Sequence, residues 1–386
     1  MADFVFKISP NVVLGTYAAN RLGQHALEYG EKFIVIMDPA LKESDTAGKI
    51  TDALKERGID FFVFDEIKES ASSDTIQSAL NLAQKAKVHG AIAIGGGKTL
   101  SFAKALCAIF FDSEKTVYDY IDENLSPPKN ALPLICLPST PRDNFIFADR
   151  AFLKDSRSSK VKILKTQNGL CKLVVWDPNL QSSLNETQIS YMTLQVLAFI
   201  VEGYISQKAN FFSDMIIEKA SQLFSQAVDG AEALSQTTPR EILLTQAGFA
   251  ASLGASSSSF GAANLLSLSI NVRYKVSRSL LSAILLPHII EDALTFKAEK
   301  LATLARILKA CPADASTQDA CQSLVSYVKQ KSEKAAVPSD LRSVSPALSI
   351  EQLSIAVEDA GELELVNNLQ RSMTSDDLFE IIKNAY

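Results

Sequence analysis

The sequence is poor in histidine. Among 386 residues there are only three, His25, His89 and His288. Histidine is the most common ligand of catalytic zinc and iron, and it is the side chain that most often moves protons near neutral pH. The scarcity argues against a histidine-rich metal centre and narrows the choice of acid–base groups.

Cysteine pairs, a basic excess and long apolar runs are also missing. The five cysteines are scattered without a CxxC pair, which indicates reduced thiols and no zinc-binding spacing; they are Cys107, Cys136, Cys171, Cys311 and Cys321. Lys plus Arg number 38 against 44 Asp plus Glu, a net charge of -6 that argues against a general nucleic-acid binder.

No apolar run reaches the length of a transmembrane helix, and the first residues lack the basic-then-apolar pattern of a secretion signal. We therefore expect a cytoplasmic protein that binds a small-molecule ligand or substrate, with neither nucleic acid nor membrane as a partner. Homo-oligomerisation is left open.

What is present centres on three consecutive glycines. An apolar run over 90–94 leads into Gly95, Gly96 and Gly97, and a segment with helical apolar spacing follows from Lys98. This pattern predicts a strand, a tight turn and a helix, whose free N–H groups favour an anion such as phosphate. The same glycines also suit close strand–helix packing alone, so both interpretations stay open.

The first half of the chain alternates strand and helix patterns. Strands are expected at 32–37, 61–64, 90–94, 132–137 and 173–176, with helices near 44–57, 73–88 and 98–111. This alternation predicts a parallel sheet with helices on both faces, and ligands of such sheets bind at the carboxyl ends of the strands. Asp38 ends one such strand and would accept hydrogen bonds from a ribose, which favours NAD. A turn or capping role before Pro39 is an equal alternative.

Beyond residue 185 the apolar spacing is helical, through 191–206, 212–227, 240–253 and 280–295. The sequence thus predicts a Rossmann-like α/β domain over 1–180 and an all-helical domain over 181–386.

Several short motifs together resemble a known family. They are Gly-Gly-Gly-Lys-Thr-Leu-x-x-Ala-Lys from Gly95, Thr116–Tyr120, Leu132–Leu134, Pro138–Thr140, Asp177-Pro178, Glu202–Tyr204 and Leu285–His288. In this order they resemble the iron-containing alcohol dehydrogenase and glycerol dehydrogenase superfamily, whose fold group includes dehydroquinate synthase. The matches span roughly residues 12–310, and the Lys-Thr form of the glycine motif looks most like glycerol dehydrogenase.

The resemblance implies a cofactor, NAD(H) or NADP(H), bound in a cleft between the two domains. Its pyrophosphate would lie on the triple glycine, and its nicotinamide side near the turn after 137. Mapped onto this chain, the cofactor-binding residues are Asp38, Gly95, Gly96, Gly97, Lys98, Ser139 and Thr140.

The family also places a divalent metal on one Asp and two or three His of the helical domain. Reading back from Glu202 and Tyr204, the first two ligand positions fall on Gln195 and Phe199. The third follows Leu253-Gly254 and falls on Ser257, and the fourth precedes Leu285–His288 and falls on or near Arg278. An amide, a phenyl ring, a hydroxyl and a guanidinium do not make a tight site for zinc or iron. We therefore expect a degenerate metal site without a tightly bound metal.

Two functions remain open, and with them whether the chain is an enzyme. One is a metal-independent oxidoreductase acting on a small alcohol or carbonyl, in which Arg278, Arg142 or Lys160 supplies the positive charge. The alternative is a catalytically inactive family member that acts as a nucleotide or ligand sensor or binds a partner.

Overall fold

The computed structural model describes residues 9–42, 44–230, 237–345 and 348–386. The chain forms two compact units. The α/β unit comprises Met1–Thr140, Phe145–Ser158 and Lys162–Ser183, and the helical unit comprises Pro141–Asn144, Ser159–Val161 and Leu184–Tyr386. This architecture confirms the predicted fold class, an α/β part with a parallel sheet followed by an all-helical part.

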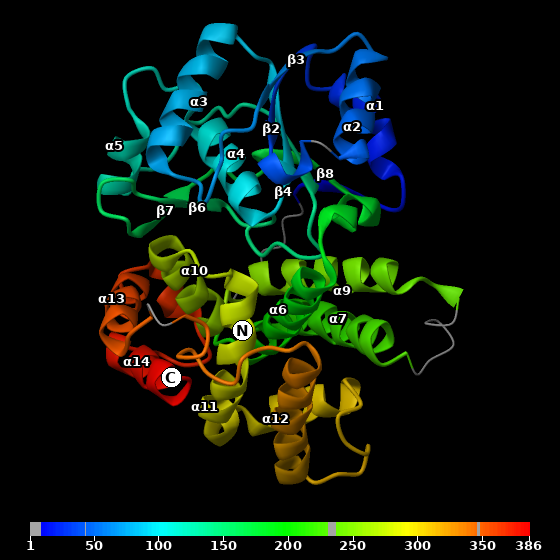
Figure 1. Ribbon diagram of the computed structural model, residues 1–386, viewed down its shortest axis with the longest axis vertical. Coiled ribbons are helices and arrows are strands. Elements are labelled where there is room, and N and C mark those ends of the chain that lie inside the picture. The colour runs from blue at the N-terminus through cyan, green and yellow to red at the C-terminus, as the bar shows by residue number, and fades with distance from the viewer. Residues whose placement is uncertain (1–8, 43, 231–236, 346–347) are drawn as a thin grey trace. The chain divides into compact units, whose positions relative to one another are not determined.

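A six-stranded parallel sheet forms the centre of the α/β unit (Figure 1). In spatial order its strands are β1 (Asn11–Leu14), β8 (Cys171–Trp176), β5 (Leu134–Pro138), β4 (Gly90–Gly95), β2 (Lys32–Met37) and β3 (Asp60–Phe64). The central strands are continuous apolar runs because both of their faces are covered. The register pairs Gly95 with Pro138 and Ile94 with Met37, so three strands end at one edge of the sheet.

Helices cover both faces of this sheet. Figure 1 shows α1 (Leu22–Ala26) and α2 (Asp45–Lys55) on one side, and α3 (Ser73–Ala86), α4 (Gly97–Ile109) and α5 (Val117–Asp122) on the other. Alternate residues of the strands face the first pair, as the strand period of two requires. Phe33, Val35 and Met37 of β2 form one buried cluster with Ile50 and Leu54 of α2.

Two short strands were not predicted with the rest. β6 (Arg150–Lys154) and β7 (Val161–Lys165) pair in a separate two-stranded sheet, and β1 is also absent from the predicted set. A 3-10 turn at Ala18–Arg21 precedes the short helix α1.

The helical unit consists of packed helices, α6 (Glu186–Ile205), α7 (Phe211–Asp229), α9 (Arg240–Ser256), α10 (Ala262–Tyr274), α11 (Arg278–Ile307), α12 (Thr317–Lys334), α13 (Ile350–Gly361) and α14 (Ser375–Asn384). Asn185 and Asn210 start α6 and α7 with capping boxes. Gly203 of α6 and Gly254 of α9 allow close packing on α7, since a Cβ at either would come within 2.8 Å or 2.5 Å of Ile217.

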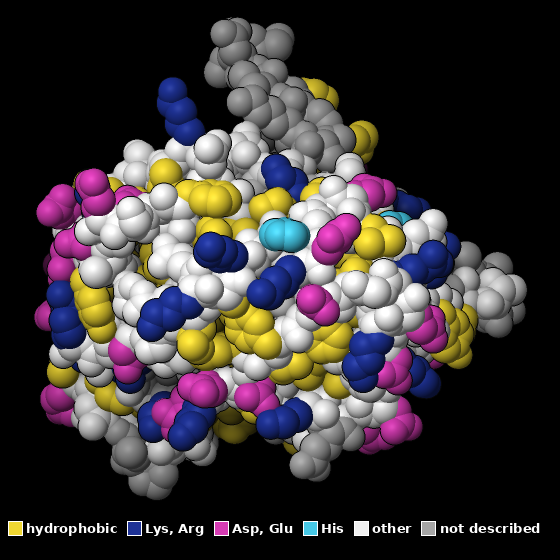
Figure 2. All heavy atoms as spheres, turned by 90° about the horizontal axis from the view of Figure 1, so that it is seen from above, with side chains coloured by type: hydrophobic (Ala, Val, Ile, Leu, Met, Phe, Trp, Pro, Cys, Tyr) yellow, Lys and Arg dark blue, Asp and Glu magenta, His cyan; other side chains and the backbone are white. Residues whose placement is uncertain are grey.

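One helix in the described part of the chain, α11, is long and apolar enough to cross a membrane. In the structure, 61% of its apolar 18-residue stretch is buried. Core helices of this length pass the same test. On the face seen in Figure 2, Lys and Arg side chains are interspersed with Asp and Glu.

A buried lysine fixes the chain after β5. Lys104 of α4 is 2% exposed, and its Nζ donates to the carbonyl oxygens of Phe145, at 2.6 Å, and Ala148. Without Lys104, the buried Phe145 carbonyl and the partly buried Ala148 carbonyl would lose this donor. A charged donor is well suited to hold two acceptors at once.

We expect Lys104→Met to lower the free energy of unfolding by about 2 kcal/mol, because it leaves one buried and one partly buried carbonyl group without this donor. Urea unfolding followed by circular dichroism measures the change. The matched control is Lys55→Met, because the Lys55 side chain is 63% exposed and forms its ion pair with Asp52 on the surface. We expect it to stay within about 0.5 kcal/mol of the parent protein. Equal effects of the two variants would contradict the role given to Lys104.

Candidate functional site

The glycine turn lies at the carboxyl edge of the sheet, where β4 passes into α4. Gly95 has a φ of +158°, and a Cβ there would lie 2.7 Å from Thr99 Oγ1 and 3.0 Å from Asp38 Cβ. A Cβ on Gly96 would lie 3.3 Å from the Thr140 methyl group. Close packing within the protein therefore requires glycine at Gly95, whereas Gly96 has room for a small side chain.

The start of α4 leaves backbone donors open. The N–H groups of Thr99 and Leu100 donate to the Gly96 carbonyl at 2.9 Å and 3.1 Å, so those of Gly97 and Lys98 precede the first helical hydrogen bonds. Gly96, Gly97 and Lys98 are partly exposed, whereas Gly95 and Thr99 are buried. Partly exposed N–H groups at the start of a 13-residue helix suit a phosphate, and the turn fits the pyrophosphate of a dinucleotide.

The end of β5 is fixed against the same turn. The Ser139 N–H donates to the Gly95 carbonyl at 3.0 Å, and Trp176 Nε1 donates to the Thr140 carbonyl at 3.0 Å. Both hydroxyl side chains are buried. The structure thus brings all seven residues predicted to bind the cofactor to one edge of the sheet.

Asp38 has two partners at this edge. Its Oδ1 accepts from the Ala40 N–H at 3.2 Å and so caps the short 3-10 helix Pro39–Leu41. Its Oδ2 lies 3.6 Å from Lys98 Nζ, which also donates to the Lys68 carbonyl at 3.0 Å. The capping role that the sequence left open is therefore present in the structure.

In the helical unit, the short segment Pro141–Asn144 lies against α9. A Cβ on Gly248 would come within 1.8 Å of the Pro141 carbonyl oxygen, so only glycine permits this approach. The Asp143 N–H donates to Ser252 Oγ at 3.0 Å. These contacts fix the backbone on both sides of Arg142.

Arg142 begins a chain of polar side chains. Its Nε and Nη2 donate to Gln195 Oε1 at 2.8 Å and 2.5 Å. Gln195 Nε2 donates to Asn264 Oδ1 at 3.0 Å, and Asn264 Nδ2 donates to Glu202 Oε2 at 2.8 Å. Gln195, Asn264 and Glu202 are each at most 2% exposed. We call these four residues the polar chain.

Glu202 ends the polar chain at the start of α10. Its Oε1 accepts from the Ala263 N–H at 2.6 Å, and a Cβ at Gly261 would overlap the carboxyl group at 2.1 Å. Gly261 also has a φ of +79°, which favours glycine. Burial raises the pKa of Glu202 to about 8, against the opposing effect of the hydrogen bonds from Ala263 and Asn264.

The end of the polar chain opposite Glu202 is positively charged. Burial and the neighbouring Arg278 lower the pKa of Arg142 to about 9, and burial lowers the pKa of Arg278 to about 10. Both groups therefore remain cations at neutral pH. Asp143 acts in the opposite direction on both pKa values. Gln195 is neutral, so its bonds orient the Arg142 guanidinium without cancelling its charge.

The residues at the four predicted ligand positions do not fit a zinc or iron ion. Gln195 bonds to Arg142 and Asn264, Phe199 is buried, and Ser257 Oγ donates to the Leu253 carbonyl at 3.0 Å. Arg278 is a cation. Among the described residues, no three His, Cys, Asp or Glu side chains lie together as a metal would need.

Lys160 has a different environment. Its Nζ lies 2.9 Å from Glu362 Oε1 and 3.4 Å from Asp359 Oδ1, and Arg273 also pairs with Asp359. Hydrogen bonding to Glu362 raises the pKa of Lys160. The structure therefore places this candidate in an ion-pair cluster with Asp359 of α13 and Glu362, the residue after that helix.

Asn264 is the residue of the polar chain that the sequence analysis missed. It joins Gln195 to Glu202, which lie 69 and 62 positions from it. Its only local signal is a glycine three residues before it, and that pattern predicts neither a site nor a cap.

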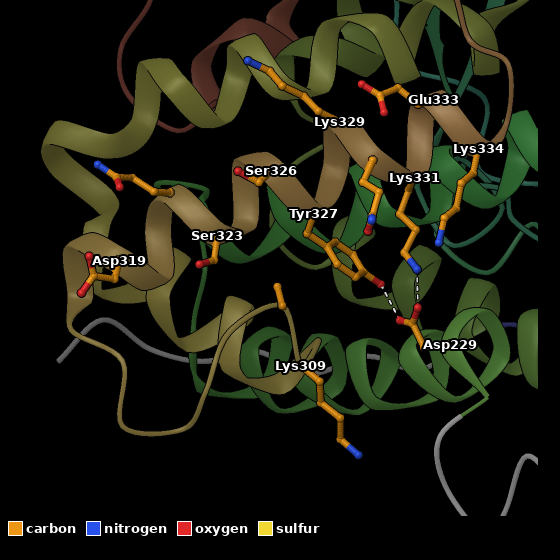
Figure 3. Close-up of a pocket in the computed structure, with 13 residues that line it drawn as sticks. Asp229, Lys309, Asp319, Ser323, Ser326, Tyr327, Lys329, Lys331, Glu333 and Lys334 are labelled. Carbon is orange, nitrogen blue, oxygen red and sulfur yellow. Dashed lines mark hydrogen bonds and ion pairs between the residues drawn. The ribbon is translucent and has the colours of Figure 1, made fainter.

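A cavity of about 1070 Å³ lies elsewhere in the helical unit, along α12. Figure 3 shows Tyr327 and Lys331 pointing toward Asp229, and the Tyr327 hydroxyl donates to Asp229 Oδ2 at 2.8 Å. Lys331 also pairs with Asp229. Burial and Asp229 raise the pKa of Tyr327, so the phenol stays protonated. These contacts tie α12 to α7, and we assign the cavity no chemistry.

Both parts of the chain match known protein families. Residues 9–178 match the iron-containing alcohol dehydrogenase family, and residues 190–386 match the C-terminal domain of the Fe-containing alcohol dehydrogenase family. The chain is 21% identical to the lactaldehyde reductase of Escherichia coli over 357 residues, which cover 92% of each chain.

Solved structures agree in fold. An alcohol dehydrogenase from Oenococcus oeni matches with a TM-score of 0.87 at 20% identity, covering 98% of both chains. A sulfoacetaldehyde reductase from Bifidobacterium kashiwanohense, solved in complex with NAD+, matches with a TM-score of 0.82 at 16% identity, covering 99% of both. Because the two family matches together span most of its length, the chain belongs to the iron-containing alcohol dehydrogenase family.

Proposed function

We propose that this protein binds NAD(H) or NADP(H) and transfers hydride to or from a small alcohol or carbonyl compound without a bound metal. The observation that carries the proposal is the bonded pair of Arg142 and Gln195. By the resemblance of the motif around Glu202 and Tyr204, Gln195 maps to a position where the family has a metal ligand. Here that position orients a cation from the protein itself.

Dinucleotide binding is supported by the glycine turn. The partly exposed N–H groups at the start of α4, the open Gly96 and the clustered Asp38, Ser139 and Thr140 suit a pyrophosphate and its attached ribose. Relatives of the same fold include an NADH-dependent butanol dehydrogenase and the reductase solved with NAD+.

The bound dinucleotide would supply the hydride chemistry itself. The protein's contribution is to orient the substrate and to stabilise negative charge on the reacting oxygen. A guanidinium held by two bonds to Gln195 and surrounded by buried groups is suited to that task, because its direction is fixed in advance. Arg142 follows Thr140 by two residues, so one short stretch of chain carries both groups.

The second candidate function is an inactive family member that senses a nucleotide or binds a partner. It is favoured by the closure of the polar chain, since both oxygens of Glu202 accept from protein donors and Phe199 offers no polar group. Dinucleotide binding without turnover of any small alcohol, aldehyde or ketone would support this function over catalysis.

We expect Gly96→Ala to weaken NADH binding by about tenfold or more, because the added methyl group hinders the close approach of a pyrophosphate to the turn. The substitution should leave the fold intact, since Gly96 has a φ of -85° and its added Cβ meets only the Thr140 methyl at 3.3 Å. Titration of NADH followed by fluorescence measures the affinity. Gly48→Ala is the control, because a Cβ there meets nothing within 4 Å. Unchanged affinity in Gly96→Ala would contradict a pyrophosphate at this turn.

If the protein is an oxidoreductase, Arg142→Met should lower turnover by about 100-fold or more while NADH binding is retained, because charge stabilisation is lost and side-chain bulk is kept. Steady-state kinetics on the best substrate from a screen of small alcohols and carbonyls measures this. Lys160→Met removes a cation that forms ion pairs with Asp359 and Glu362. We expect its turnover to stay within about twofold of that of the parent protein. A larger loss in Lys160→Met than in Arg142→Met would reverse the assignment.

Removal of metal ions should change neither the ligand binding nor the stability of the protein. We expect prolonged dialysis against a chelator to alter neither NADH affinity nor the thermal unfolding midpoint, because the side chains at the four ligand positions offer no metal-binding set. Elemental analysis before and after dialysis provides the control. One tightly held iron or zinc ion per chain would refute the metal-free proposal.

A further inference from the structure

We propose that Lys98 allows this protein to bind NADP(H) as well as NAD(H), by neutralising Asp38 at the carboxyl edge of the sheet. The inference rests on the proposed dinucleotide binding and specifies which dinucleotides are accepted. It starts from the 3.6 Å distance between Lys98 Nζ and Asp38 Oδ2.

An acidic residue at the end of the second strand ordinarily selects NAD(H). Its carboxylate accepts hydrogen bonds from the ribose hydroxyls and repels a 2'-phosphate. Asp38 occupies that place, directly after β2, with its N–H bonded to the Ile94 carbonyl at 2.9 Å. By itself, this residue favours NAD(H).

In this structure the Asp38 carboxylate already has partners at both oxygens. Oδ1 caps the 3-10 helix through the Ala40 N–H, and Oδ2 faces the Lys98 ammonium group. Asp38 and Lys98 together carry no net charge. The Lys98 ammonium group would attract a 2'-phosphate that approaches this pair. This attraction offsets the repulsion between the phosphate and the Asp38 carboxylate.

The position of Lys98 is set by the fold. Lys98 is the second residue of α4, and its Nζ donates to the Lys68 carbonyl at 3.0 Å while it faces Asp38. The Lys98 side chain is 29% exposed and that of Asp38 is 17% exposed, so a ligand can reach both. An ammonium group held in this way can bind a phosphate oxygen as a point charge.

The test compares the affinities for NADH and NADPH by fluorescence titration. We expect the parent protein to bind the two within about tenfold of each other, and Lys98→Met to weaken NADPH relative to NADH by about tenfold or more. Lys98→Arg should preserve the parent ratio because it keeps the charge. Asp38→Asn should shift the ratio toward NADPH. Lys55→Met, which removes an exposed lysine paired with Asp52, is the matched control and should leave the ratio unchanged.

Three outcomes would overturn the inference. Equal weakening of both dinucleotides by Lys98→Met would mean that the ammonium group binds the pyrophosphate that they share. Unchanged affinities for both would mean that Lys98 takes no part in binding either dinucleotide. A parent protein that binds NADH more than about 100-fold tighter than NADPH would show that Asp38 acts unopposed. If neither dinucleotide binds to the folded parent protein, the proposed function itself fails, and the variants are not needed to show it.

Discussion

Glu202 is a carboxyl group inside a bundle of helices, and the polar groups around it are arranged to satisfy it. Removing such a group from water is costly unless donors replace the solvent. The Ala263 N–H and the Asn264 amide supply those donors, and Gly261 provides the space. The orientation of one side chain then determines that of the next in the polar chain. An amide that points its nitrogen toward one neighbour must point its oxygen toward the other.

The two ends of the polar chain therefore decide the direction of its middle. Glu202 offers acceptors, so the Asn264 nitrogen faces it and the Asn264 oxygen faces Gln195. The Gln195 nitrogen donates to that oxygen, which leaves the Gln195 oxygen for the guanidinium of Arg142. A guanidinium has donors only. An acceptor at one end and a donor at the other thus give both amides a single consistent orientation, and Ser282 Oγ adds a further donor to Asn264 at 3.3 Å.

The sequence reveals those parts of this molecule that depend on neighbours in the chain. The apolar runs of β2 and β4, each closed by an acid or a glycine, predict the parallel sheet and the edge where the turn lies. The helix α10 is less visible, because its apolar spacing is interrupted by serines that are buried and bonded in the fold, as when Ser269 Oγ donates to the Ala356 carbonyl at 2.7 Å. The polar chain joins residues 53 to 69 positions apart, and no local pattern encodes such a contact. The sequence likewise does not show that Lys160, a candidate for the site's positive charge, pairs with Glu362, which lies 202 positions away.

The fixed direction of the polar chain also constrains how the sequence can change. If Gln195 alone became Asp, a carboxylate oxygen would face the Asn264 oxygen, and turning Asn264 to meet it would take the nitrogen away from Glu202. The substitution is therefore opposed by Asn264 even though Arg142 would pair with the new carboxylate, so its effect depends on which residues stand at both neighbouring positions. The four residues of the polar chain therefore constrain one another, and a change at one of them is best tolerated when its bonded neighbours change with it.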